Sequence, residues 1–526
     1  MVNIGRYAAV LLLGSVTVLS GCTGTPGSPR GTTGGGGGGG GTSGGGNAPL
    51  TILVTDQPAS AVDVLSFSIT ITGATLQPGN VALISSPQTF EITQLQTNSA
   101  VLSSLGVPPG NYASLDLTFA NPSMTILNTG TPLATTPICA TDVLCTFAPT
   151  LNAASLTLST SPFPLTASGG TPVGLLLDLN LSDLLQPGNI SVDPTASGAV
   201  TVASIAQVTS TQVLAGISSL TGQVTNVGAN QFTLLAYNGA SSVVSVTSDT
   251  TYFFPSTVCQ ANSFSCVLLN QVVTLQANVL GSGTITASQV NYENAPGTQG
   301  VEGPIVAIQS GAATTTLAVV VNQVIAGVTG VALGDIATVT VSNTVNTSTT
   351  ANSTSTIFSI DTDGATLPAG VSFASSTDLL VGQEILVGLS GPVTTTTAGP
   401  AFSANQVTLR SGNVDGDVFL VDQGTSTFTM TDLPVLFTTL TPTNITQITA
   451  QTSSTTFFET LELDSLAGLA AGQPVAVGGL LFNTITSTGY PTIDARTVRG
   501  LVSTTLQQQQ KRSKPGASQR RYVASL

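Results

Sequence analysis

The sequence predicts an all-β protein: an N-terminal β-sandwich followed by three small β-barrel-like repeats. Three observations support this class. Apolar residues alternate with hydroxyl residues in many short segments, which is typical of half-buried strands. Pro-Gly, Gly-Asn and Asp-Gly pairs bound these segments as turns. The second half of the chain repeats one pattern of glycine, glutamine, alanine and valine three times, which indicates a repeated structural unit.

Composition narrows the function before any motif does. Only 6% of the 526 residues are charged, and the chain has no histidine and no tryptophan, but 41% of residues are hydrophobic, enough to fill several cores. Without histidine, Ser-His-Asp and Cys-His catalysis are excluded. No lysine precedes Lys511, so a buried lysine base is excluded as well. A folded, charge-poor protein is expected.

The charges are distributed unevenly. All 24 acidic residues lie between Asp56 and Asp494, and from Asp56 to Arg499 the only basic residues are Arg410, Arg496 and Arg499. Such a body repels nucleic acid, so no nucleic-acid partner is expected. Residues 501–526 are basic and predict a solvated, disordered tail, with contact to a phosphate-bearing glycolipid or another polyanion as the alternative.

The amino-terminal sequence predicts export. Residues 1–21 combine a short positive region with a 13-residue apolar run, YAAVLLLGSVTVL, which is too short to span a bilayer and typical of a secretory signal. The stretch ends in Leu19-Ser20-Gly21-Cys22, which resembles the bacterial lipobox. That resemblance implies that the Cys22 thiol becomes a diacylglyceryl thioether and that Cys22 becomes the mature amino terminus. Residues 22–48 would then form a lipidated, glycine-rich, disordered tether.

Lipidation sets the expected location and partners. The protein would be held in the cell envelope by its lipid, on the periplasmic or the surface side. Thr23, rather than aspartate, follows the cysteine, and by analogy with lipoprotein sorting in enteric bacteria this favours the outer membrane. The membrane is therefore one partner, and an extracellular glycan or an envelope protein is a possible second.

The remaining cysteines predict two local disulfides. They form the stretches CATDVLC, with Cys139 and Cys145, and CQANSFSC, with Cys259 and Cys266. An exported chain meets oxidising conditions, and each pair closes a short loop. Other pairings remain open. A metal site is the rival interpretation, but the missing histidine and the long spacings disfavour it, so neither a metal nor a cofactor is expected.

Residues 49–210 are expected to form the β-sandwich. The element PPGNYASLDLTF, a turn followed by an alternating strand, is similar to a feature of transthyretin-like and collagen-adhesin sandwiches with an immunoglobulin-like fold. The VTDQP opening, the element F-x-I-T-x-L and PPGNY occur in the order that resembles the bacterial family called domain of unknown function 4382. That family implies no activity. Single helical turns are expected within residues 179–185 and 461–469.

Three repeats are expected at residues 219–295, 301–411 and 412–500. Each has an opening glycine, a later Gly/Asn-Gln step and a closing Ala-x-x-Val, a pattern that resembles the family called domain of unknown function 5666. This resemblance implies five- or six-stranded barrels similar to an oligonucleotide/oligosaccharide-binding fold. The second repeat is longer, and its run TVSNTVNTSTTANSTSTIF is the expected insertion. Linkers near residues 209–219, 295–301 and 411–415 are expected to be sensitive to proteases.

Paired carboxylates are the remaining catalytic candidates, and no catalytic residue is assigned. The pairs are Asp361 with Asp363, Asp415 with Asp417, and Glu459 with Glu462. Glycoside hydrolysis uses two such groups beside a cleft. The first two pairs lie in Asp-Gly contexts, which favour solvated turns, and a weak calcium site is the alternative although no EF-hand pattern follows.

The sequence therefore favours a non-catalytic, lipid-anchored envelope protein whose β domains form a structural and binding array. A carbohydrate-binding surface module is the alternative, although sugar stacking favours tryptophan, which is absent. A glycosidase-like enzyme is the third possibility.

Overall fold

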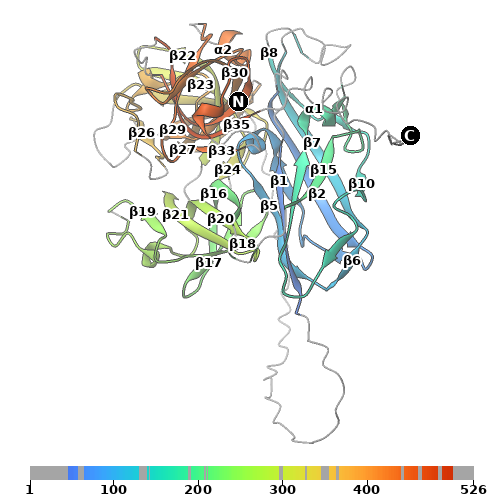
Figure 1. Cartoon of the computed structure of the whole chain (residues 1–526). Helices are drawn as coiled ribbons and strands as arrows, with labels where there is room; N and C mark the ends of the chain where they lie inside the picture. Colours follow the sequence, from blue (N-terminus) through green and yellow to red (C-terminus); the bar gives the residue numbers. More distant parts are fainter. Residues whose placement is uncertain are drawn as a thin grey trace, which may run out of the picture. The chain divides into compact units, whose positions relative to one another are not determined.

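The regular secondary structure of the computed structural model is almost all β-strand, which confirms the predicted all-β class (Figure 1). Among the residues it describes, no helix has the length and apolar composition needed to cross a bilayer. The structure describes residues 46–56, 64–128, 139–140, 143–186, 191–205, 209, 211, 213–256, 258–294, 300–325, 328–344, 355–362, 366–397, 399–439, 444–459, 465–483 and 489–500. Cys22, the tether and the basic tail lie outside this set.

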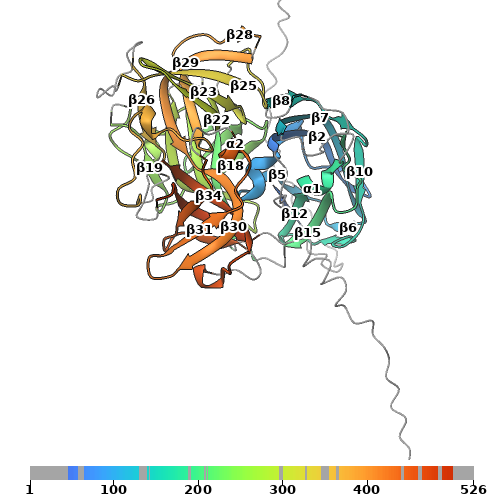
Figure 2. The same cartoon turned by 90° about the horizontal axis from the view of Figure 1, so that it is seen from above.

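The N-terminal domain is a sandwich of two main sheets, which face each other in Figure 2. The first sheet has the order β15 (Val200–Ile205), β12 (Val173–Leu179), β1 (Ala48–Thr55) and β5 (Ala100–Val107). The second has the order β10 (Ser155–Leu158), β7 (Ser114–Asn128), β2 (Val64–Gln77) and β3 (Val81–Ala82), with β4 (Gln88–Glu91) on β2 and β8 (Val143–Phe147) on β7.

One hydrophobic core lies between these sheets. Strand β2 turns Phe67, Ile69 and Ile71 inward, each at most 1% exposed, as its period-two pattern predicts. Smaller pieces complete the domain: β6 (Gly110–Tyr112) with β11 (Leu165–Ala167), β13 (Leu185–Gln186) with β14 (Ser191–Val192) and β9 (Thr150–Leu151), η1 (Ile92–Gln96) and α1 (Leu181–Leu184). The helical turn expected within residues 179–185 is thus confirmed.

Three closed five-stranded barrels follow the sandwich, and they confirm the predicted barrel-like repeats. The first consists of β16 (Val213–Val227), β17 (Gln231–Ala236), β18 (Ser241–Ser245), β20 (Val272–Leu280) and β21 (Ile285–Asn294). The second consists of β22 (Gly300–Ser310), β23 (Thr314–Val320), β25 (Ile336–Ser342), β27 (Glu384–Leu389) and β29 (Gly399–Arg410). The third consists of β30 (Gly412–Asp422), β31 (Thr427–Thr431), β32 (Ile448–Gln451), β34 (Pro474–Phe482) and β35 (Thr492–Gly500).

All three barrels have the same topology. The first three strands form an antiparallel meander, the third pairs in parallel with the last, and the fourth closes the barrel between the last and the first. Each barrel also pairs one short strand in parallel with its last strand: β19 (Thr251–Phe253), β26 (Ile357–Ile360) and β33 (Phe457–Glu459). Short helices precede the fourth strands: η2 (Phe264–Cys266), η3 (Ser376–Asp378) and η4 (Leu466–Gly468), and α2 (Leu436–Thr439) lies in the third barrel.

The residues that recur in the sequence make the same contact in every barrel. The glutamine of each Gly/Asn-Gln step accepts a hydrogen bond from the backbone N–H three residues earlier, at 2.7 Å for Gln271, 2.7 Å for Gln383 and 3.0 Å for Gln473. A threonine hydroxyl donates to the carbonyl of the alanine in each Ala-x-x-Val, from Thr250, Thr356 and Thr456. The repeat is therefore a repeat of specific hydrogen bonds as well as of strands.

The second barrel contains more than the expected insertion. It adds β24 (Gln323–Ile325) between β23 and β25, and β28 (Thr394–Thr396) before β29. The centre of the Ser/Thr/Asn-rich run, residues 345–354, lies outside the described residues. The extra length is thus shared between that run and the β24 segment.

The expected linker near residues 411–415 is wrong. Only Ser411 separates β29 from β30, and residues 412–415 lie inside β30. Likewise, residues 213–219 belong to β16 rather than to a linker. Leu480 and Phe482 of the third barrel pack into the core of the second, and Gln383 donates to the Leu481 carbonyl at 2.9 Å. The second and third barrels therefore share core residues.

Candidate functional site: buried carboxylates around Arg410

Among the acidic residues singled out from the sequence, Asp361, Asp415 and Asp417 are described by the structure, and they do not lie in solvated turns. Asp361 follows β26 with a side chain only 12% exposed, and Asp415 and Asp417 lie within β30. Asp363, Glu462 and the side chain of Glu459 lie outside the described residues. The turn expectation fails at Asp415 because β30 continues through it and pairs it with Ala476 of β34.

Arg410 is the centre of a buried charge cluster. It ends β29, and its side chain is 2% exposed. Its Nη1 donates to Glu293 Oε1 at 2.6 Å and to Asp361 Oδ2, and its Nε lies 3.5 Å from Glu302 Oε1. Its Nη2 donates to the hydroxyls of Thr221 at 3.1 Å and Thr274 at 2.8 Å. One guanidinium thus joins strands of the first and second barrels.

The cluster holds more negative than positive charge. Three carboxylates surround one guanidinium, whose fixed fork of donors suits such bridging. Burial raises the pKa of Glu293, and the positive charge of Arg410 opposes that rise. Nearby, Glu384 accepts a hydrogen bond from Asn322 Nδ2 at 2.6 Å. Burial, reinforced by the charge of Glu302, raises the pKa of Glu384 well above its usual range.

A cavity of about 230 Å³ lies beside this cluster. Glu91 and Glu302 both line it, and Glu302 Oε2 has no hydrogen-bond partner among the described residues. Glu91 is the N-cap of η1: it accepts from the backbone N–H of Phe67 at 2.6 Å and of Gln94 at 3.1 Å, and from the Thr93 hydroxyl at 2.6 Å. Burial nevertheless raises the pKa of Glu91 to about 7.

A second group of carboxyls surrounds Asp56. Its Oδ1 accepts from the backbone N–H of Leu181 at 3.1 Å, and Arg499 Nη1 donates to its backbone carbonyl at 3.1 Å. Burial raises the pKa of Asp56 well above its usual range, and the charges of Asp178 and Asp415 add to that rise. Burial also raises the pKa of Asp415 to about 7.

Asp415 and Glu384 line a smaller cavity of about 120 Å³. Asn413, two residues before Asp415 on β30, also lines it and ties β30 to the N-terminal domain. Its Nδ2 donates to the Thr93 carbonyl at 3.2 Å, and its Oδ1 accepts from the Thr97 hydroxyl. The carboxyl of Asp415 is therefore enclosed where β30 meets η1.

The chemistry open to these carboxyls is limited by their partners. A carboxyl with a pKa near 7 suits acid–base catalysis at neutral pH. However, Glu91 accepts hydrogen bonds from η1 and β2, and Arg410 pairs with Asp361, Glu293 and the Oε1 atom of Glu302. Asp415 differs, because its buried Oδ1 has no hydrogen-bond partner among the described residues. Within the described part of the chain, no three acidic or cysteine side chains are grouped closely enough to hold a metal ion. The cluster is arranged as a junction between domains.

Sequence reasoning missed Arg410, Arg499, Glu91, Glu302 and Glu384. The one indication in the sequence was that basic residues are scarce in the body of the chain: three arginines among 24 acidic residues are expected to be paired. Which groups they contact was not predictable: Arg410 is 117 residues from Glu293 and 189 from Thr221.

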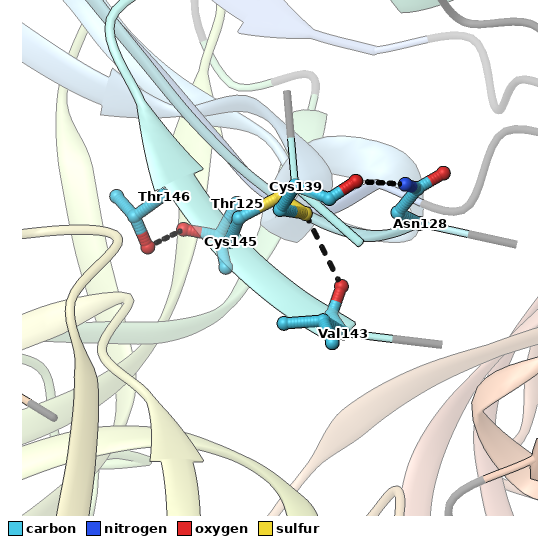
Figure 3. The surroundings of a disulfide bond; sticks show 6 residues. All are labelled: Thr125, Asn128, Cys139, Val143, Cys145 and Thr146. Atoms are coloured by element: carbon cyan, nitrogen blue, oxygen red, sulfur yellow. Dashed lines mark hydrogen bonds between the residues drawn. A yellow bond between two sulfur atoms is a disulfide. The ribbon is translucent and has the colours of Figure 1, made fainter. Parts of the chain in front are cut away.

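The structure contains the two disulfides expected from the sequence, Cys139–Cys145 and Cys259–Cys266. Figure 3 shows the first, where Asn128 Nδ2 donates to the Cys139 carbonyl at 2.6 Å. Beside it, Thr146 donates to the carbonyl of Gly334 in the second barrel at 2.7 Å. The β7–β8 pair thus contributes another contact between the sandwich and a barrel.

Comparison with known proteins bears on the N-terminal domain alone. No curated protein matches the chain. Residues 47–194 match the family described as domain of unknown function 4382, which supports the resemblance noted in the N-terminal sequence.

Proposed function

We propose that the chain is a non-catalytic cell-envelope lipoprotein, anchored by a lipid on Cys22 and placed in the outer membrane. The Leu-Ser-Gly-Cys sequence after an apolar run, and the glycine-rich stretch that follows, support the anchor. On this proposal, the sandwich and the three barrels are one scaffold held away from the membrane by residues 22–48.

The single observation that supports a scaffold over an enzyme is the Arg410 cluster. Its ion pairs link the end of the second barrel to Glu293 of the first, and Asp361, one of the paired carboxylates considered for catalysis, is among the groups it binds. A carboxylate engaged by a buried guanidinium serves assembly of the domains. A binding scaffold needs such fixed junctions, because its domains must present a constant surface.

The barrels also carry the pattern that resembles domain of unknown function 5666, and we propose that all three belong to that type. The partners we propose are the membrane, through the lipid, and an envelope protein or a neutral glycan. The surplus of acidic over basic residues in the body disfavours nucleic acid.

Replacing the lipidated residue tests the anchor. In Cys22→Ala, the precursor should remain unprocessed and labelled palmitate should no longer be incorporated. Cys139→Ala is the matched control, because it removes a different cysteine and should leave labelling and fractionation unchanged. If Cys22→Ala still takes up palmitate and matures normally, the proposed anchor is wrong.

The glycosidase alternative has a direct test. Hydrolysis of polysaccharides by the purified full chain, abolished by Asp415→Asn with Asp417→Asn, would replace the scaffold proposal with an enzymatic one. We expect no turnover by either protein.

A further inference from the structure

A pocket of about 480 Å³ on the first barrel is unlike the cavities near the carboxyls. It is formed by the β16–β17 turn, the segment after β18, strand β19 and the disulfide-closed loop of residues 259–266. Its described lining includes two aromatic rings and several neutral amide and hydroxyl groups, and none of the described lining residues is charged. The lining residues include Asn230, Ser248, Tyr252, Asn262, Ser263 and Phe264. The volume falls within the range of about 300–1,000 Å³ common for ligand pockets.

The pocket is held in shape by covalent and hydrogen bonds. The Cys259–Cys266 disulfide closes the loop that carries Asn262, Ser263 and Phe264. Asn262 has a positive φ of 41° and accepts a hydrogen bond from the Phe254 N–H at 3.1 Å through Oδ1. Phe264 packs against Phe232 of the barrel core, with 6.4 Å between ring centroids. Binding groups fixed in this way lose little conformational freedom when a ligand arrives.

Hydrogen-bonding capacity remains available in the pocket. The side-chain amide of Asn230 is exposed and has no hydrogen-bond partner among the described residues. The Nδ2 group of Asn262 is also unengaged within that set, because only its Oδ1 is used. Tyr252 and Phe264 are each half-buried, so parts of both rings remain accessible.

We propose that this pocket binds a neutral sugar, with the rings of Tyr252 and Phe264 against its C–H groups and Asn230 and Asn262 bonded to its hydroxyls. A purely apolar ligand would leave the amides and hydroxyls unpaired, which costs free energy. A charged ligand would find no opposite charge in the described lining, and the acidic body repels anions. A neutral sugar can pair its hydroxyls with the amides and hydroxyls of the pocket and place its C–H faces against the two aromatic rings.

This inference rests on the proposed function, since it names the ligand class of the binding scaffold. The test uses the full mature chain in a detergent without a sugar head group. Saturation-transfer NMR and calorimetry would be run with maltotriose, cellotriose, mannotriose and N,N′-diacetylchitobiose, and with trigalacturonate as the anionic comparison. We expect at least one neutral probe to bind and trigalacturonate not to bind.

Variants assign that binding to the pocket. Tyr252→Ala and Asn230→Ala should each weaken binding by about tenfold or more, equivalent to about 1.4 kcal/mol. Phe253→Ala is the matched control: it removes the neighbouring ring of β19, which is 46% exposed and does not line the pocket, and it should bind as the wild type does. Asn230 lies in an exposed turn, so its variant remains informative if Tyr252→Ala does not fold.

The proposal is overturned if none of the neutral probes binds, if trigalacturonate binds more tightly than they do, or if Asn230→Ala and a folded Tyr252→Ala bind as the wild type does. The lipid anchor is tested separately by palmitate labelling. A negative result in the sugar-binding test would therefore not contradict the lipid anchor, and a negative result in the labelling test would not contradict sugar binding.

Discussion

Glu293 and Arg410 each lie three residues after the closing valine of their repeat, and they form an ion pair with each other, with 2.6 Å between Oε1 and Nη1. The same sequence position thus carries opposite charges in consecutive barrels. The contact between these two barrels therefore uses a position that the repeat pattern leaves variable. The recurring glutamine and Ala-x-x-Val residues make the same internal bonds in every barrel, and Gln383 in addition donates to the third barrel.

Arg410→Met should destabilise the protein more than any other arginine variant. It leaves Glu293, Glu302 and Asp361 buried together without a counter-charge, and breaking a buried pair in this way costs about 3–5 kcal/mol. The loss should be larger at pH 8 than at pH 5, because protonation relieves the repulsion. Urea unfolding followed by circular dichroism measures it.

Arg496→Met is the control for that experiment. Arg496 pairs with one carboxylate, Asp494, at 2.8 Å, so its removal leaves one carboxylate without a counter-charge rather than three; it should therefore cost less and depend less on pH. Equal losses for the two variants would show that the Arg410 cluster does not stabilise the junction.

The sequence predicted the features that depend on residues close along the chain. It missed the contacts that form only when strands distant in the sequence pair and close a barrel. Strands such as β2 and β31 follow from period-two alternation, and α1 follows from its local pattern. The Asp-Gly pair at Asp415 was misinterpreted as a turn, because glycine occurs both in turns and where two strands approach closely. A Cβ on Gly416 would approach the Thr431 carbonyl oxygen to 2.7 Å, so this glycine permits close strand contact and does not make a turn.

Asp415→Asn should make the protein more stable at neutral and higher pH. The wild-type pKa of Asp415 rises from 3.8 to about 7 on folding, so the folded state holds the proton more tightly than the unfolded state does. Wild-type stability should therefore fall as pH rises from about 4 to 7 and then level off. Asparagine cannot ionise, and the variant should gain at most about 4 kcal/mol at pH 8 while matching the wild type near pH 4.

Unfolding in urea across pH 4–8 measures this difference. Asp249→Asn, which changes an exposed aspartate, should leave the pH dependence unchanged. Some pH dependence should remain in Asp415→Asn, since the pKa of Glu91 is also about 7. A variant that loses stability with pH as steeply as the wild type would show that the Asp415 carboxyl is not enclosed.

The third barrel should depend on the second for its stability. Leu480 and Phe482 are at most 1% exposed in the chain because they pack into the core of the second barrel. A fragment of residues 412–500 would expose both side chains, and it should bind 8-anilinonaphthalene sulfonate and unfold at lower urea than a fragment of residues 300–500. In the full chain, limited proteolysis should spare residues 410–415. If the short fragment is as stable as the long one and binds no dye, the shared core contributes nothing.

The repeated glutamines offer a comparison in which the residue and the strand context are constant and only the neighbours differ. Gln383 is fully buried: besides accepting from the Leu380 N–H, its Nε2 donates to the carbonyls of Asp378 at 3.1 Å and Leu481 at 2.9 Å. Gln473 is half-buried and accepts from the Ala470 N–H at 3.0 Å.

Gln383→Ala should therefore cost more free energy of unfolding than Gln473→Ala. The first variant leaves a buried N–H and the Leu481 carbonyl unpaired and opens a cavity between two barrels, for a loss of about 3 kcal/mol or more, whereas the second should lose about 1 kcal/mol. Urea unfolding of both variants at one pH measures the difference. Equal losses would mean that the bond from Gln383 to the third barrel adds nothing to the contact that every repeat already makes. The second and third barrels would then be joined by their apolar side chains and by Asn483, whose Nδ2 donates to the Thr377 carbonyl at 3.2 Å.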